Sequence, residues 1–296
     1  MFIIKHKKIF ISISIVLVLL SIISLFTFGL KVGIDFKGGA LTEVVYRGAQ
    51  PTQEEIDSSI KGLELGSTII QPTGEKGYII KSRDLSDEEH AELLVKLSIE
   101  NKYPLDETNF NSIGPSVGKE LTRKAVTAVI LVSLAIICFI AFAFRKVSKP
   151  VSSWRYGFIA IVTLLHDVII PVGLFVILSR YYNAEVDTLF VVAILTVLGL
   201  SVSDTIVIFD RIRENLKNET RQPFPEIVGR SLEQSFARSI ATSLTVILVL
   251  LALFFFGPIS TKYFALMLVA GMFFGTYSSI FLASPLLVFV EEWQNN

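Results

Sequence analysis

The chain has 296 residues, of which 52% are hydrophobic, and its 27 basic and 27 acidic residues leave no net charge. A mean hydropathy of +0.61 is too high for an ordinary soluble domain, so the composition predicts a membrane protein. The lack of a positive net charge argues against nucleic-acid binding. The single cysteine, Cys138, excludes an intrachain disulfide and a cysteine metal cluster, and the histidines are too scattered to indicate a metal site. We therefore expect no metal and no cofactor.

The first apolar run, from Ile9 to Leu30, is uncharged and follows a short basic segment, 1–8. It is long enough to cross the hydrocarbon core of a bilayer. It is also longer than the apolar part of a typical signal peptide, and no A-x-A cleavage site follows it. We expect residues 1–30 to form the N-terminus and a retained first transmembrane span.

Residues 31–123 are polar and numerous enough for one small folded domain. Ser86 followed by Glu89 predicts a capping box at the start of a helix, and Leu93, Leu94 and Leu97 predict its apolar stripe. The order of the predicted elements is strand, helix, strand, strand, helix, strand, which is typical of a ferredoxin-like α+β domain. The predicted strands are 41–46, 67–71, 78–81 and 109–113, with a turn at 72–77, and the predicted helices are 52–63 and 86–101.

Five further apolar segments fill residues 124–296 and predict a five-helix transmembrane domain. They are 124–144, 154–178, 188–209, 239–257 and 263–290. Six spans place both termini on one side of the membrane. The short segments on that side contain Lys5, Lys7, Lys8, Arg145, Lys146, Lys149, Arg155, Arg211, Arg213, Lys217, Arg221, Arg230 and Arg238, against Arg180 and Lys262 opposite. The positive-inside rule therefore predicts cytoplasmic termini and an extracytoplasmic domain at 31–123.

The segment 210–238 is too long for a simple turn, and Pro223 and Pro225 divide it. Its second half, 226–237, alternates charge with apolar residues at helical spacing. This pattern predicts an amphipathic helix along the cytoplasmic face. The helix can be a solvated connector or a docking site for a partner.

The fourth predicted span carries an aspartate, Asp204, within the stretch VLGLSVSDTIVIFDRIREN at 197–215. An aspartate in a span costs about 2.5–3.5 kcal/mol on insertion scales, so it is a functional candidate. Arg238, at the cytoplasmic end of the fifth span, is the candidate cation, which protonation of the carboxylate would release. The alternatives are a structural aspartate bonded to Ser201 or Thr205, and an arginine that merely extends to the interface.

A second polar pair, His166 and Asp167, lies near the middle of the third span. Neighbouring residues on a helix point about 100 degrees apart, so at least one of the two should face protein rather than lipid. An imidazole titrates in the physiological range and suits proton relay. The alternative is an inward hydrogen-bonding pair that fixes helix packing.

Small residues predict close helix packing in the same spans. Gly199, Ser201 and Ser203 lie in the fourth span, and GMFFG places Gly271 and Gly275 four residues apart in the sixth. The motif GIDFKGG, at 33–39, lacks the spacing of a nucleotide-binding loop and predicts a glycine-permitted turn that opens a strand.

These motifs together resemble the SecD/SecF family of protein-export membrane subunits. The resemblance covers nearly the whole chain: GIDFKGG after the first span, the His166–Asp167 pair, SDTIVIFDRIREN at 203–215 and ARSIATSLTVILVLLALFFFG at 237–257. The modest external domain favours the SecF branch over SecD, whose external domain is much larger. The resemblance implies a six-span unit of the resistance-nodulation-division type in a bacterial cell membrane.

The resemblance also implies a function and partners. Such a unit pairs with SecD beside the SecYEG channel and uses the proton-motive force to draw unfolded preproteins outward after the SecA step, with YajC and YidC as further partners. It is a transport subunit rather than an enzyme. Asp204 matches the family's proton-pathway aspartate and Arg238 its partner arginine, and we assign His166 and Asp167 to the same pathway. The motif and structural positions are Gly33, Asp35, Gly38, Gly39, Gly199, Ser203, Asp210 and Arg211.

Three other functions remain to be separated from this one. The first is an assembly subunit without proton coupling, in which Asp204 is structural. The second is an intramembrane aspartyl protease using Asp167 and Asp204, although neither lies in a YD or GxGD context. The third is a small-molecule exporter, against which the modest external domain argues. Six helices are also too few to enclose all three polar positions, so we expect another membrane subunit to cover some of them.

Overall fold

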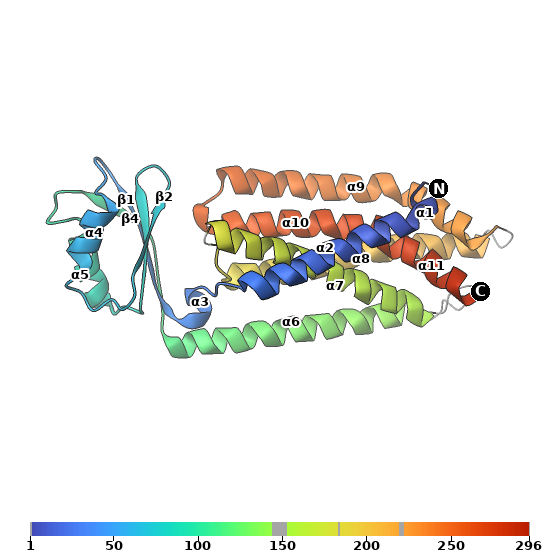
Figure 1. The fold of residues 1–296 in the computed structure, drawn as a ribbon, viewed down its shortest axis with the longest axis horizontal. Helices are drawn as coiled ribbons and strands as arrows, with labels where there is room; N and C mark the ends of the chain where they lie inside the picture. Colours follow the sequence, from blue (N-terminus) through green and yellow to red (C-terminus); the bar gives the residue numbers. More distant parts are fainter. Residues whose placement is uncertain (1, 144–152, 183, 219–221, 296) are drawn as a thin grey trace. The chain divides into compact units, whose positions relative to one another are not determined.

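The computed structural model describes residues 2–143, 153–182, 184–218 and 222–295. The chain forms two compact units (Figure 1). One, at Val32–Val126, is called the external unit because most of it lies outside the apolar spans, and the other is a helical unit made of Met1–Lys31 and Thr127–Asn296. The basic residues Arg145, Lys146, Lys149 and Arg221, on which the predicted orientation partly rests, lie outside the described residues.

The external unit is an antiparallel sheet covered on one face by two helices (Figure 1). The strands are β1 (Gly39–Tyr46), β2 (Ile69–Thr73), β3 (Gly77–Ser82) and β4 (Leu105–Ile113), in the order β2-β3-β1-β4. The helices are α4 (Gln53–Ile60) and α5 (Asp87–Leu97), and a short helix, α3 (Ile34–Lys37), precedes the sheet. This order is that of a ferredoxin-like domain, so the predicted fold class is confirmed.

Local sequence signals define the two helices of this unit. Thr52 with Glu55, and Ser86 with Glu89, form capping boxes in which each side chain bonds the other residue's backbone N–H. Apolar side chains then close the core between the helices and the sheet. Fully buried members are Ala40, Val44, Ile56, Leu93 and Leu97.

Several predicted boundaries in this unit differ from the structure, and three of the differences have consequences for its strands and helices. Helix α5 ends at Leu97 rather than Asn101, because residues 99–101 turn with positive φ angles of 47, 57 and 64 degrees. Strand β4 begins at Leu105 rather than Asn109. Pro72 belongs to strand β2 rather than to a turn, which an edge strand permits because proline has no N–H to donate.

Acid is expected to loosen the start of α5. A hydrogen bond from Arg83, joined by the backbone N–H of Ser86, lowers the pKa of Glu89 from 4.5 to about 2. Because the folded-state pKa is the lower one, this contribution to stability is present above pH 4.5 and disappears as the pH falls towards 2. Amide hydrogen exchange at α5 in the intact protein should therefore accelerate over that interval, and Glu89→Gln should weaken the pH dependence.

The matched control is Glu92→Gln, since Glu92 is an exposed carboxylate on the same helix that takes no part in the capping box. An unchanged pH profile in Glu89→Gln would contradict the assignment.

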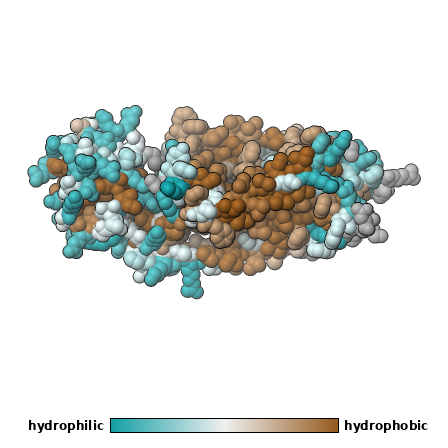
Figure 2. All heavy atoms as spheres, in the orientation of Figure 1, coloured by the Kyte–Doolittle hydropathy of each residue, from teal (hydrophilic) through white to brown (hydrophobic). Residues whose placement is uncertain are grey.

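In the part of the chain that the structure describes, six helical segments are long and apolar enough to cross a membrane. The helices are α2 (Lys7–Phe28), α6 (Pro115–Ala143), α7 (Ser153–Tyr182), α8 (Thr188–Asn218), α9 (Phe224–Phe256) and α10 (Lys262–Ser278), the last continuing through η2 (Ser279–Ala283) into α11 (Ser284–Asn295). The short helices α1 (Phe2–Lys5) and η1 (Ile259–Thr261) complete the unit. Figure 2 shows hydrophobic residues over most of the visible surface of these helices, as lipid contact requires.

Several of these helices are longer than predicted. Helix α6 begins at Pro115, where proline suits a first helical position, and α8 continues to Asn218. The expected surface helix at 226–237 is not a separate element, because α9 runs without a break from Phe224 to Phe256. The stretch that joins it to the fifth span, from Ala237 to Ser239, contains no glycine or proline to end the helix.

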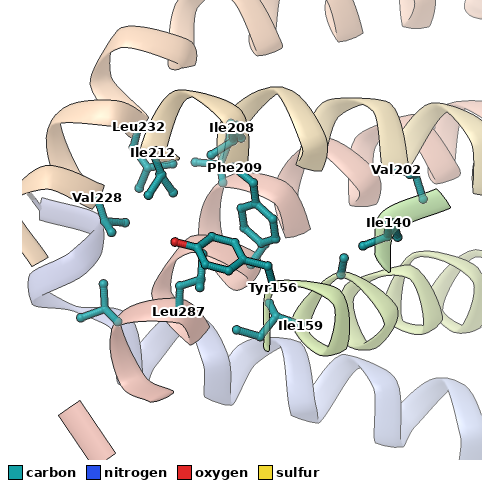
Figure 3. Close-up of a cluster of buried hydrophobic side chains, with 14 of the residues drawn as sticks. Ile140, Tyr156, Ile159, Val202, Ile208, Phe209, Ile212, Val228, Leu232 and Leu287 are labelled. Atoms are coloured by element: carbon teal, nitrogen blue, oxygen red, sulfur yellow. The ribbon is translucent and has the colours of Figure 1, made fainter. Parts of the chain in front are cut away.

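The core of the helical unit joins α7, α8, α9 and α11 (Figure 3). The ring of Tyr156 meets that of Phe209 edge-on, with centroids 5.3 Å apart, and Ile159, Leu232 and Leu287 pack in the same cluster. An ion pair between Lys7 and Glu292 joins the two ends of the chain, which lie at the same end of this unit (Figure 1).

Glycines allow the spans to approach closely. A Cβ at Gly271 would lie 2.1 Å from Val197 Cγ2, and one at Gly275 would lie 3.2 Å from Ser201 Cβ, so α10 packs directly against α8. Gly173, which the sequence analysis did not single out, plays the same part between α7 and α2, since its Cβ would lie 2.3 Å from Ser21 Cβ. Gly199 has no such role, because a Cβ there would meet nothing within 4 Å among the described residues.

Candidate functional site

The glycine motif at 33–39 forms the entrance to the external sheet. Gly33 precedes helix α3, Asp35 lies in its first turn, and Gly38 and Gly39 then adopt φ angles of +82 and +135 degrees. A Cβ at Gly39 would lie 2.8 Å from Ser82 O, and one at Gly118 would lie 2.9 Å from Gly38 N. The glycines are therefore needed because the turn is pressed between β3 and the start of α6.

The polar pair in α7 faces the interior of the helical unit. His166 and Asp167 are 3% and 0% exposed, so neither contacts lipid. His166 Nδ1 lies 2.8 Å from Asp167 Oδ1, and the imidazole ring stacks on Tyr277. Among the described residues, His166 Nε2 has no hydrogen-bond partner.

Asp167 is the point at which three helices meet. Its second carboxylate oxygen, Oδ2, accepts a hydrogen bond from Ser201 on α8 and another, at 2.7 Å, from Ser278 on α10. With His166 on α7, three donors surround a fully buried carboxylate. Such satisfaction is required because an unpaired buried carboxylate would cost several kcal/mol.

A π-helical turn in the sixth span presents the hydroxyls that reach this site. Ser278 and Ser279 mark its start, and Ser279 Oγ shares a hydrogen bond of 2.8 Å with Thr205 on α8. Pro285 lies just beyond the turn and lacks the N–H that a regular helix would use. Ser284 Oγ also donates to Ser279 O across the turn, at 3.4 Å. Wide turns of this kind are frequent at functional sites.

Asp204 lies one turn along α8 from Ser201 and has different partners from those predicted. Its Oδ1 accepts a hydrogen bond of 2.7 Å from Ser239 on α9, rather than from Ser201 or Thr205. Its Oδ2 is buried and has no partner among the described residues. No ion pair joins Asp204 to Arg238 within the described chain, although both side chains border the same cavity.

That cavity has a volume of about 140 Å³ and lies between α8, α9 and α10. Its lining includes the carboxylate of Asp204, the exposed side chain of Arg238 and several hydroxyls. The lining residues are Leu200, Ser201, Ser203, Asp204, Val207, Arg238, Ser239, Thr242, Ser243, Val246, Gly271, Met272, Gly275 and Thr276. A polar cavity needs only about 10–15 Å³ for one water molecule, so this one has room for several.

The remaining predicted residues of α8 lie apart from the two carboxylates. Asp210 pairs with Arg213 at 2.9 Å, and Arg211 donates to Gln234 on α9 at 2.7 Å. Asn215 donates to the same Gln234 at 2.8 Å. The contacts to Gln234 join α8 to the first third of α9, so Arg211 is placed to hold the two helices together, whereas the pair formed by Asp210 lies within α8.

Sequence reasoning missed most of the hydroxyls that hold the carboxylates. Ser239, Ser278 and Ser279 contact the site directly, and Ser243 shares a hydrogen bond with Thr276 across α9 and α10. The available signals were the spacing of Ser239 and Ser243, four residues apart within an apolar span, and the run GTYSS at 275–279.

The geometry does not favour the protease alternative. The described part of the chain has no hydrogen bond between Asp167 and Asp204, whereas a catalytic pair must share a proton. No group of three or more His, Cys, Asp or Glu side chains is placed to hold a metal among the described residues.

The fold and the site together define a multi-pass membrane protein with a small external α+β unit, whose spanning helices enclose two carboxylates joined to them by hydroxyl groups. Two family models match it: "Protein export membrane protein SecD/SecF, C-terminal" over residues 95–293, and "SecD/SecF GG Motif" over residues 23–49. The chain belongs to the SecD/SecF family of protein-export membrane proteins and acts in Sec-dependent protein translocation.

Similar proteins include the protein translocase subunit SecF of Thermobaculum terrenum, 39% identical over 99% of this chain and 94% of that one, and its counterpart in Anaerolinea thermophila, 36% identical over 99% and 96%. The SecDF protein of Brucella abortus is 34% identical over 88% of this chain and 33% of its own length. The crystal structure of SecDF, a translocon-associated membrane protein from Thermus thermophilus, matches with a TM-score of 0.82 and 30% identity over 99% of this chain and 38% of that chain.

Proposed function

We propose that this subunit uses the proton-motive force to promote preprotein export, and that Asp204 with Arg238 forms its proton-responsive site. The carrying observation is a buried carboxylate oxygen of Asp204 that has no hydrogen-bond partner among the described residues and borders the same cavity as the exposed side chain of Arg238. Asp204 can thus exist in two states, protonated and neutral, or ionised and compensated by Arg238. Changing between them alters which groups on α8 and α9 attract one another.

His166 and Asp167 form the second part of the proposed proton pathway. Asp167 lies deeper than Asp204, at 0% exposure, and is hydrogen-bonded to helices on both sides. A proton arriving at this pair would weaken the bonds from Ser201 and Ser278, because a neutral carboxyl accepts hydrogen bonds less strongly than a carboxylate. Helices α7, α8 and α10 would then be free to shift relative to one another.

We further propose that the subunit works with SecD, beside SecYEG and SecA and with YajC and YidC, in the cytoplasmic membrane of a bacterium with both termini in the cytoplasm. Support for a membrane partner comes from the Asp204 cavity, which is bordered by the exposed side chains of Leu200, Arg238 and Thr242. A neighbouring subunit would cover these surfaces.

The alternative is an assembly subunit without proton coupling. The observation that favours it is the complete pairing of Asp167, whose three hydrogen bonds join α7, α8 and α10 as a structural centre would. Asp204 separates the two functions, because one of its oxygens has no such partner among the described residues.

Asp204→Asn is expected to abolish the stimulation of export by the proton-motive force while leaving assembly with SecD intact. Asparagine keeps the shape and can accept the Ser239 hydrogen bond, but it cannot exchange a proton. Pulse-chase export of a secreted preprotein, in cells depleted of the native subunit, measures the first effect, and co-purification of SecD measures the second.

Asp210→Asn is the matched control, since Asp210 is an exposed aspartate on the same helix. Normal export in Asp204→Asn would remove the proton mechanism. Loss of export together with loss of SecD would favour the assembly function.

A further inference from the structure

Ser201 belongs to both carboxylate sites. Its hydroxyl donates to Asp167 Oδ2, and the same residue lines the cavity that contains Asp204 and Arg238. Ser201 and Asp204 are three residues apart on α8, so they lie on one face of the helix. One hydroxyl group therefore stands between the cavity and the deeper carboxylate.

We propose that Ser201 is the proton entrance to Asp167, which makes the His166–Asp167 pair a second, inner proton site filled from the Asp204 cavity. This inference rests on the proposed function and adds to it a residue and a direction of transfer. A hydroxyl is suited to the task because it donates and accepts at the same oxygen.

The transfer conserves atoms and charge. The Oγ–H bond of Ser201 breaks as its proton moves to Asp167 Oδ2, and Oγ takes a new proton from a water molecule in the cavity. That water molecule regains a proton from Asp204 or from bulk water. The reverse sequence empties the site, and nothing is oxidised or reduced. The cavity volume of about 140 Å³ accommodates the water that the first step requires.

Ser278 provides an internal comparison. It donates to the same Asp167 oxygen at 2.7 Å and also contacts Gly275 O at 3.0 Å, but it is not among the residues that line the cavity. Ser201 and Ser278 are thus equivalent as hydrogen-bond donors to Asp167, but only Ser201 can pass a proton from the cavity to it. A purely structural role would make the two serines interchangeable.

The titratable and charged groups beside this route come from each of the helices around it. They are His166 on α7, Asp204 on α8, Arg238 on α9 and Tyr277 on α10. His166 is bonded to Asp167 and stacked on Tyr277, so its position on the far side of Asp167 makes it the inner acceptor of the pair.

The test follows protonation of Asp167 in the full chain, reconstituted with its SecD partner in vesicles of the native lipids. Infrared difference spectra after a pH step contain the carboxyl bands of Asp167 and Asp204, each assigned by its loss in the corresponding Asp→Asn variant. The quantity compared is the rate at which the Asp167 band appears. Ser201→Ala is expected to slow this rate by at least about tenfold, as loss of a positioned proton-transfer group does, without slowing the Asp204 band.

Two matched variants separate the proton route from the hydrogen bond. Ser243→Ala removes a cavity hydroxyl that contacts neither carboxylate and should leave the rate near that of the wild type, whereas Ser278→Ala removes the other hydroxyl bonded to Asp167 and should slow the rate far less than Ser201→Ala does. Thr242→Leu, which fills the cavity from α9 and leaves Ser201 in place, should slow the Asp167 band, so the test stands even if Ser201→Ala does not assemble.

Equal rates in Ser201→Ala and Ser278→Ala, or an unchanged rate in Thr242→Leu, would overturn the inference. Such a result would refute only the role of Ser201 if the Asp204 band still responds to pH and Asp204→Asn still abolishes stimulated export. The proposed function would then stand. If the Asp204 band does not respond and Asp204→Asn exports normally, the proposed function fails and the inner site fails with it.

Discussion

Asp167→Leu is expected to prevent the helical unit from forming a stable protein, whereas Asp167→Asn is expected to preserve it. Leucine would leave the donors on His166 and Ser201 buried without their acceptor, and Ser278 would keep only its contact with Gly275 O. Each unsatisfied buried donor costs about 1–3 kcal/mol, so the combined loss is a large part of the stability of a typical protein. Leucine and asparagine have the same number of side-chain heavy atoms and the same branching at Cγ, so the two variants differ chiefly in polarity.

Asparagine can reproduce the hydrogen bonds of this site. Its oxygen accepts from the two serines, and its amide donates to His166 Nδ1 once the imidazole proton occupies the other nitrogen. The measurements are the amount of each variant in membranes and its temperature of aggregation in detergent. Leu165→Ala is the control, since Leu165 is 55% exposed on the neighbouring position of α7. A stable Asp167→Leu variant would show that these hydrogen bonds are dispensable for packing.

Gly271→Ala is expected to separate α8 from α10 and to destabilise the protein by about 1–3 kcal/mol or more, the usual cost of overpacking. The added Cβ would lie 2.1 Å from Val197 Cγ2 and 2.9 Å from Cγ1. Valine cannot rotate away easily, because a β-branched side chain has one strongly preferred rotamer in a helix. The close approach of these helices also places Gly275 against Ser201, which donates to Asp167, so export should fall with stability.

A compensating change makes this prediction specific. Val197→Ala removes the two methyl groups that the new Cβ would meet, so the double variant should recover much of the stability lost in Gly271→Ala. Gly199→Ala is the matched control, because a Cβ at Gly199 meets nothing within 4 Å. Thermal aggregation of the four proteins in detergent provides the comparison. Absence of recovery in the double variant would place the strain elsewhere.

The two predictions concern a single arrangement of helices. Gly275 lacks a side chain where Ser201 packs, and its carbonyl accepts hydrogen bonds from Ser278 and Ser279. Close packing and polar contact therefore depend on the same residues of α10. A change that moves α10 away from α8 is expected to disturb both carboxylates, even where neither is substituted.

The sequence alone was enough to predict the spans, the external α+β unit and the three unusual polar residues of the membrane region. Hydrophobic length, capping boxes and strand patterns are local properties, and they predicted α2 and α4 and the start of α5 closely. Asp204, Asp167 and His166 stood out because ionisable groups are costly inside an apolar run. Errors at α9 and α5 arose at boundaries, where tertiary contacts decide how far a helix continues.

Only the tertiary structure decided which groups the carboxylates meet. Serine and threonine are nearly neutral in hydropathy, so nothing local distinguishes Ser278 and Ser239 from the other hydroxyls of the spans. Their partners depend on the rotation of each helix about its axis, on the π-helical turn before Pro285, and on contacts between residues more than thirty positions apart along the chain. The sequence therefore determined where charge enters the membrane region, and the packing of four helices decided what that charge can reach.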